Sequence, residues 1–202
     1  DRAASRILTL IFKSKKMQGY DYQENPDLKK HATITRQSAS EGMVLLKNES
    51  TLPLADVKNV ALLGVTSYEF IAGGTGSGDV NEAYTVSLEE GLTNAGFEIN
   101  EKGKAAFEAH KAANVESFKK PEGMDALFNP FTPPEISYSM EQLDSIAISA
   151  DIGILTLGRN AGEGGDRKEV DDFLLSDNEQ QMVKNVAQAF HNVGKKLVVV
   201  LN

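Results

Sequence analysis

DIGILTLG, residues 151–158, is a short and nearly continuous apolar run, and it decides the fold class. Apolar runs of this length, without alternation of polar and apolar residues, are typical of strands buried on both faces of a parallel sheet. Two further runs have the same character, NVALLGV at residues 59–65 and KKLVVVLN at residues 195–202. Together the three runs predict a sheet of buried strands at the centre of the fold.

Helical patterns separate the predicted strands. Helices are expected over residues 85–95, 102–120, 140–150 and 176–193, and a further strand starts at residues 97–99. The last helix has the clearest signal, because SDNE at its start fits a capping box in which Ser176 bonds an amide and Glu179 reaches back. Alternating strands and helices predict an α/β fold, here a three-layer α/β/α sandwich with a mostly parallel sheet.

The N-terminal part of the chain has a different pattern. Residues 1–12, DRAASRILTLIF, carry apolar side chains at helical spacing, and a helix of this length needs a partner to be stable. A polar linker follows, and then a second helix is expected over residues 31–48. The residues that mark its buried side are Ile34, Ser38, Met43, Leu45 and Leu46.

The other end of the chain closes on a predicted core strand with no covering helix after it. We therefore expect the sandwich to be truncated at the C-terminus, with an exposed apolar flank near residues 196–202.

Composition excludes several classes of function. The chain has 202 residues, a formal net charge of −8 and only short basic spots, which argues against a nucleic-acid surface. It has no cysteine and three histidines far apart in sequence, so a structural or catalytic zinc site is not expected. The sequence contains no run of 18 apolar residues, so no membrane-spanning helix is expected either. The absence of cysteine slightly favours the cytoplasm, with the periplasm and secretion left open.

AGGTGSGD, residues 72–79, is a glycine-rich loop directly after a predicted strand. It lacks the Lys-Ser/Thr ending of a phosphate-binding P-loop and the spacing of a dinucleotide loop. Three alternatives remain open: a nucleotide site of another kind, a tight turn without a ligand, or a loop whose backbone amides and Ser77 contact a polar ligand such as a sugar. Ligands of parallel sheets bind beyond the carboxyl ends of the strands, so this loop and residues 158–167 are expected on one rim.

AGEGGDR, residues 161–167, surrounds Glu163 with glycines. One interpretation is a solvated carboxylate, or one paired with Arg167. Another is a general acid on a mobile loop, which requires a carboxyl pKa raised toward the working pH. Asp166 stands beside Arg167, whose charge should keep it ionised, so Asp166 is interpreted as a clamp of the loop rather than a nucleophile.

A series of motifs occurs in one order along the chain and resembles glycoside hydrolase family 3, of the β-glucosidase type. The motifs are SASEGMVLLKNE, LPL, VALLG, GGTGSGDV, SLEEGL, GRNAGEGGDR, LSDNEQ and KLVVVLN. The resemblance implies three parts: residues 1–18 as the tail of a (β/α)8-type barrel, residues 19–31 as an interdomain linker, and residues 32–202 as an incomplete α/β sandwich domain.

The resemblance also implies a mechanism. In this family an aspartate of the barrel is the nucleophile of a retaining reaction, and a glutamate on a sandwich loop is the acid/base. Glu163 occupies the matching position, Ser77 with its neighbour Gly76 matches a sugar contact, and Asp166 and Arg167 match residues expected to brace the loop. The partners implied are a β-linked glucoside or oligosaccharide and the preceding barrel, with no metal or organic cofactor. Without the barrel, the chain alone is expected to be inactive.

An alternative from another class remains. The glycine loops would then hold a sugar or a protein as a non-catalytic binding module, and Glu163 would have no role in chemistry.

Overall fold

The computed structural model describes residues 1–78, 80, 82–160 and 166–202. The chain divides into two compact units, Asp1–Asn48 and Glu49–Asn202. The first unit contains helix α1 (Arg2–Lys13) and helix α2 (Leu28–Gly42), and no residue of either helix is buried. Asp1 caps α1, because its carboxylate accepts from the backbone N–H groups of Ala3 and Ala4.

Helix α2 differs from the helix expected over residues 31–48. It begins earlier, where the Asp27 side chain accepts from the Lys30 N–H at 3.0 Å, and it ends at Gly42. Glycine is a poor helix former, and Met43 after it has an extended backbone. Met43, Leu45 and other residues assigned to a buried side are exposed, so that part of the prediction was wrong.

The second unit is built on four parallel strands in the described residues. They are β1 (Asn59–Leu63), β2 (Glu98–Ile99), β3 (Ile152–Leu157) and β4 (Leu197–Leu201). Their order in the sheet is β2-β1-β3-β4, and each neighbouring pair is parallel. The predicted parallel sheet is confirmed, with DIGILTLG at its centre, where every residue of β3 is buried.

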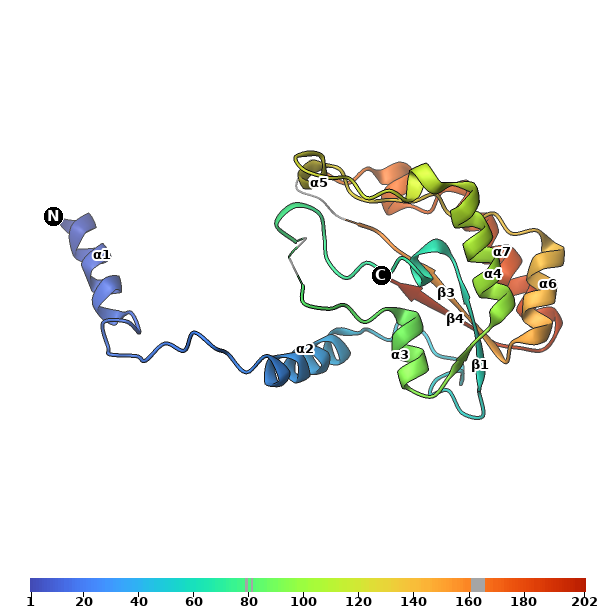
Figure 1. Ribbon diagram of the computed structural model, residues 1–202, viewed down its shortest axis with the longest axis horizontal. Coiled ribbons are helices and arrows are strands. Elements are labelled where there is room, and N and C mark those ends of the chain that lie inside the picture. Colours follow the sequence, from blue (N-terminus) through green and yellow to red (C-terminus); the bar gives the residue numbers. More distant parts are fainter. Residues whose placement is uncertain (79, 81, 161–165) are drawn as a thin grey trace. The chain divides into compact units, whose positions relative to one another are not determined.

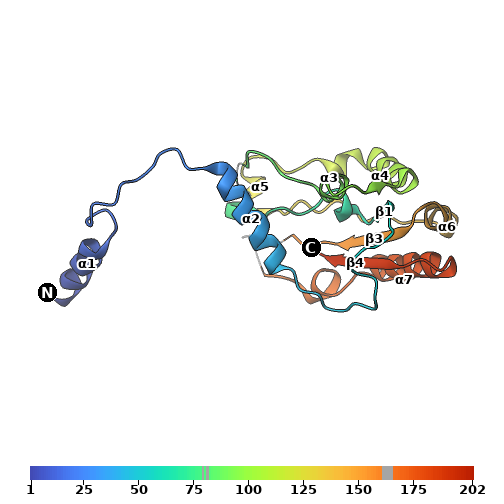
Figure 2. The same cartoon turned by 90° about the horizontal axis from the view of Figure 1, so that it is seen from below.

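Helices cover both faces of this sheet, as the sandwich prediction requires. Figure 1 shows α3 on one side of the strands and α4, α6 and α7 on the other, and Figure 2 gives a perpendicular view. The bounds are α3 (Leu88–Asn94), α4 (Glu101–Ala113), α6 (Met140–Ser149) and α7 (Asp177–Asn192). Shorter helical segments are η1 (Val65–Ser67), η2 (Gly76–Gly78), η3 (Val115–Phe118), α5 (Asp125–Phe128) and η4 (Glu169–Phe173).

Alternate residues of β1 and β3 enter two separate apolar clusters. Ala61, Leu63 and Leu155 pack with the inner sides of α4, α6 and α7, where Phe190 is fully buried. The opposite face of the same strands packs against α3. Helix α7 begins at the expected capping box, since Ser176 and Glu179 bond each other's backbone N–H groups. The sequence thus predicted the central strands β1 and β3 and the first residue of helix α7, which packs on them.

Strand β4 lies at the edge of the sheet, and its exposure agrees with the apolar flank expected near residues 196–202. Val199 and Leu201 are 46% and 66% exposed, whereas the other residues of the strand are partly buried. At the amino ends of the strands, the Asp151 carboxylate accepts from the N–H groups of Lys58 and Asn59. Lys195 donates to the carbonyls of Ala147, Ile148 and Ala150 at the end of α6. These contacts fasten the sheet on the side opposite to the glycine loops.

Candidate functional site

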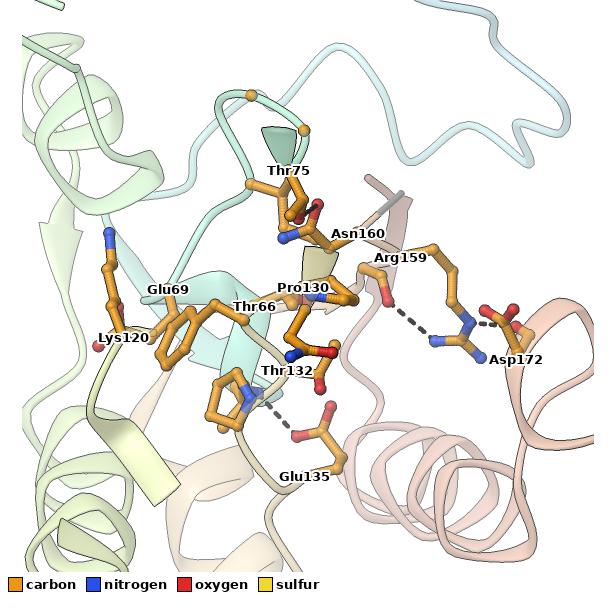
Figure 3. A pocket seen from close by; sticks show the side chains of 18 of the residues that line it. Thr66, Glu69, Thr75, Lys120, Pro130, Thr132, Glu135, Arg159, Asn160 and Asp172 are labelled. Atoms are coloured by element: carbon orange, nitrogen blue, oxygen red, sulfur yellow. Dashed lines mark hydrogen bonds between the residues drawn. The ribbon is translucent and has the colours of Figure 1, made fainter. Parts of the chain in front are cut away.

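A cavity of about 820 Å³ lies at the carboxyl ends of β1 and β3. It is lined by the segment that follows β1, by residues of the irregular stretch before α6, and by the segments on either side of residues 161–165. Figure 3 shows side chains from these segments pointing into it, with Thr75 and Glu135 at opposite ends in this view. This is the edge of a parallel sheet at which ligands bind.

The described parts of the two glycine loops meet at this edge, as expected. The Thr75 hydroxyl donates to the side-chain oxygen of Asn160 at 3.3 Å, and both residues line the cavity. Deeper in, Thr66 donates to the carbonyl of Thr156 at 3.0 Å. The chain then turns through η2, where Gly76 is buried with φ +71° and Ser77 is exposed. Thr75, which lines the cavity, therefore stands two residues before Ser77.

Glu163, the expected acid/base, lies outside the described residues. The structure does describe Asp166 and Arg167, the two residues that were expected to brace this loop. Asp166 lines the cavity, and Arg167 forms an ion pair with the carboxylate of Asp172. Asp172 also accepts from the Lys168 N–H at 3.0 Å, and this bond and the Arg167 charge lower its pKa. Arg167 thus pairs with Asp172, five residues further along the chain, and the bracing role of Asp166 and Arg167 stays a prediction.

Arg159 is the most connected residue of the site, and sequence reasoning missed it. Its guanidinium donates to both carboxylate oxygens of Glu179, at 2.6 and 2.9 Å, and to the carbonyls of Gly158 and Asp172. Burial raises the pKa of Glu179, but the bonds from Arg159 and Ser176 outweigh burial, so the net pKa is lowered. Glu179 is therefore held as the anion that Arg159 needs.

Glu135 is the second cavity residue that the sequence did not single out. Its Oε1 accepts from the N–H groups of Val65 and Ile136, at 2.7 and 2.9 Å. Burial raises the pKa of this carboxyl, while the same two N–H bonds oppose the shift. No spacing in the sequence joins Glu135 to β1, and the single hint was its place after a proline-rich stretch. A carboxyl fixed by one oxygen at a cavity wall can bond a hydroxyl of a ligand with the other.

The lining offers many hydrogen-bonding groups to a polar ligand. Hydroxyls, carboxyls, two amides and two lysines line the cavity among the described residues, and the guanidinium of Arg159 is already engaged by Glu179. Among the described residues, no group of three His, Cys, Asp or Glu side chains could hold a metal ion. In the same part of the chain, no helix is both long and apolar enough to cross a membrane.

Comparison with known proteins identifies relatives of the whole second unit. Residues 43–202 match the family described as the glycosyl hydrolase family 3 C-terminal domain. Beta-glucosidase A of Butyrivibrio fibrisolvens is 32% identical over 199 residues, which cover 86% of this chain and 22% of the relative. A beta-glucosidase of Ruminococcus albus is 30% identical, covering 81% of this chain and 17% of the relative. The chain thus spans about a fifth of the length of these curated relatives.

A solved structure agrees with the sequence matches. The beta-glucosidase 3B of Thermotoga neapolitana, in complex with alpha-D-glucose, superimposes with a TM-score of 0.81 and 34% identity. The similarity covers 96% of this chain and 27% of that protein. Fold, sequence and the resemblance in the motifs agree, and the chain belongs to the glycosyl hydrolase family 3 C-terminal domain family.

Proposed function

We propose that this chain is the second domain of a retaining β-glycosidase that hydrolyses terminal β-D-glucosides or related β-linked sugars. In this proposal Glu163 is the acid/base, Ser77 and Gly76 contact the sugar, and a preceding barrel domain supplies the aspartate nucleophile. The relatives named beta-glucosidases support the substrate class. Because the chain spans a fifth of their length, the nucleophile is assigned to the rest of the protein.

One observation carries the proposal: both glycine loops lead to the same cavity edge. Asn160 and Asp166 line the cavity, and residues 161–165 connect them. Thr75, which bonds Asn160, leads directly into Gly76 and Ser77. A sugar contact from the first loop and a carboxyl from the second can therefore act on the same ligand. The hydroxyl, amide and carboxyl groups of the lining also suit the hydroxyls of a carbohydrate.

The proposed chemistry uses two carboxyl groups and no cofactor. Glu163 in its acid form protonates the glycosidic oxygen as the barrel aspartate attacks the sugar carbon. The aglycone leaves and a glycosyl-enzyme forms. Glu163, now a carboxylate, takes a proton from water, which displaces the aspartate. Retaining enzymes hold the two carboxyl groups about 5–5.5 Å apart, which sets the approach that the loop must make.

The test compares full-length wild type with Glu163→Ala on two aryl β-glucosides, one with a good and one with a poor leaving group. Loss of an acid should slow the poor leaving group far more, since a good one needs little protonation. Added azide should restore deglycosylation, because it attacks without a general base. Glu169→Ala is the matched control, as Glu169 is an exposed glutamate in the same segment between β3 and α7.

An equal and small loss on both substrates, without azide rescue, would remove Glu163 from the mechanism. Absence of any turnover by the full-length wild type would instead favour the non-catalytic binding module. Both conclusions require that Glu169→Ala keeps wild-type activity. A loss in this control would mean that substitutions between β3 and α7 disturb the enzyme in general.

A further inference from the structure

Glu135 bonds the chain through only one of its two carboxyl oxygens. Oε1 accepts from the N–H groups of Val65 and Ile136, while within the described residues no hydrogen bond reaches Oε2. In the same part of the chain no fully buried side-chain oxygen lacks a partner, so Oε2 reaches the open space of the cavity. Figure 3 shows the Glu135 carboxyl group directed into it. An unpaired oxygen on a half-buried carboxyl costs free energy, which a ligand with a hydrogen-bond donor would offset.

The segment before Glu135 is fastened to the rest of the domain. Residues 130–134 read PFTPP, and each proline fixes its own backbone φ angle. The carbonyl oxygen of Pro134 lies 2.8 Å from Nε2 of His110 in α4. Glu135 then joins the segment to the start of η1 through the N–H of Val65. A wall fixed in this way loses little conformational entropy when a ligand binds.

Aromatic rings add apolar surface to the polar lining. Phe131, from the proline-rich segment, and Phe70, after η1, both line the cavity and are both half-buried. Sites for small molecules combine such surface with a few placed polar groups. The C–H face of a sugar ring can pack on an aromatic ring, while the sugar hydroxyls bond carboxyl and hydroxyl groups beside it.

Charge limits the class of ligand further. The described lining carries more carboxyl groups than cationic groups, and its cations are Lys120, Lys168 and Arg159. Arg159 is already engaged by Glu179. An anionic ligand, such as a phosphorylated sugar, would meet net repulsion, whereas the hydroxyls of a neutral sugar can donate to carboxylates. The cavity of about 820 Å³ lies within the range of about 300–1,000 Å³ that is typical of small-molecule sites.

We propose that the Glu135 wall of the cavity binds the leaving-group sugar of a neutral β-linked oligosaccharide, with Glu135 Oε2 accepting from one of its hydroxyls and Phe131 packing on its ring. This inference rests on the proposed function, in which Gly76 and Ser77 contact the sugar. Thr75, beside Gly76, lines the same cavity. In the view of Figure 3, Thr75 and Glu135 lie at opposite ends of the cavity, so a ligand that starts at the loop of Thr75 can extend toward Glu135.

The experiment uses the full-length protein with Glu135→Gln. Its substrates are methyl β-D-glucoside and two glucose disaccharides, cellobiose with a β-1,4 linkage and its β-1,3-linked isomer. All have poor leaving groups, but only the disaccharides have a leaving-group sugar. The oxygen of the glutamine can still accept from Val65 and Ile136, while its NH₂ group replaces the acceptor that faces the cavity.

For the disaccharide that the wild type hydrolyses faster, kcat/KM should fall about 10- to 100-fold in Glu135→Gln, mainly through a higher KM. The loss for methyl β-D-glucoside should be much smaller. Phe131→Leu gives a second readout, because leucine keeps an apolar side chain and removes the ring. Its KM for the disaccharide should rise about 2- to 10-fold. If Glu135→Gln does not fold, this variant decides the question.

The matched control is Asp151→Asn. Asp151 also accepts from two backbone N–H groups, those of Lys58 and Asn59, but it stands at the amino ends of the strands, at the opposite end of the sheet. It should leave the ratio of rates for disaccharide and methyl β-D-glucoside at the wild-type value. A purely structural role of Glu135 predicts the same unchanged ratio for Glu135→Gln, and that outcome would overturn the inference.

The wild-type rates separate this inference from the function on which it rests. If the full-length protein hydrolyses neither the disaccharides nor any aryl or methyl β-glucoside, the proposed function fails, and this inference with it. If it hydrolyses the aryl and methyl β-glucosides but neither disaccharide, the cavity does not receive a leaving-group sugar. In that case the inference fails while the function stands.

Discussion

Replacing Gly64 with alanine tests whether the chain leaves β1 as described. Gly64 has φ +82° and ψ +146°, a conformation that side chains with a Cβ rarely adopt. Its N–H donates to the Tyr138 hydroxyl at 3.1 Å. A Cβ added here would stand 2.6 Å from the carbonyl oxygen of Thr156 and 3.2 Å from a methyl of Leu155. The nearest atom belongs to the backbone of β3, which cannot rotate away.

Two terms give the magnitude. Holding alanine in this backbone region costs about 1–3 kcal/mol. Forcing a methyl against a packed strand costs about another 1–3 kcal/mol. Gly64→Ala should therefore lower the free energy of unfolding by about 2–6 kcal/mol, a large part of the roughly 5–15 kcal/mol of a typical domain.

The assay is equilibrium urea unfolding followed by circular dichroism, with Gly96→Ala as the matched control. Gly96 also has a positive φ, +94°, but an added Cβ would meet nothing within 4 Å. The control isolates the backbone term, and the difference between the two variants measures the contact with Thr156. If Gly64→Ala costs no more than Gly96→Ala, the close approach of β1 and β3 at this point is refuted.

Two further predictions concern Ser67, just after β1, and Glu135 in the cavity wall. Ser67→Ala should cost about 1–3 kcal/mol in urea unfolding, since the buried Ser67 hydroxyl donates to the Leu63 carbonyl at 2.6 Å and bonds the Thr156 hydroxyl at 2.8 Å. No measurable loss would contradict that network. Glu135→Gln should stabilise the protein increasingly as the pH rises above 4.5, because burial raises the pKa of Glu135 above that value and its ionisation then opposes folding. Melting temperatures from pH 4 to pH 7 measure this, and a difference independent of pH would contradict it.

Local signals in the sequence predicted the layers well. The apolar run at β3 and the capping box at Ser176 are determined by neighbouring residues, and both are confirmed. The expected burial of Met43 and Leu45 was wrong. A row of apolar residues predicts an apolar face, but it does not show which other segment covers that face. Gly42 ended the helix before that row could lie on a helical face.

The site was predicted less completely than the fold. The meeting of the two glycine loops followed from the rule that parallel strands place their following loops at one edge, and Thr75 with Asn160 confirms it. The bond from Arg159 to Glu179 spans 20 residues and leaves no periodic trace. The capping box already accounted for the Glu179 carboxylate, so no sequence pattern predicted its additional ion pair with Arg159. Contacts of Glu135 with the end of β1 depend on the tertiary fold in the same way.

The pairing of β1 with β3 has a consequence for how the protein folds. Lys58 and Asp151, which meet at its start, are 93 residues apart in the chain. Contacts between such distant segments form slowly, because the entropy of closing the intervening chain is lost before the contact repays it. The run α6-β3-α7-β4 is contiguous in sequence and can gather first. Thr75 can reach Asn160 only after β1 has docked, so the cavity edge is completed late, and an early folding intermediate would have α6 and α7 in place without a cavity.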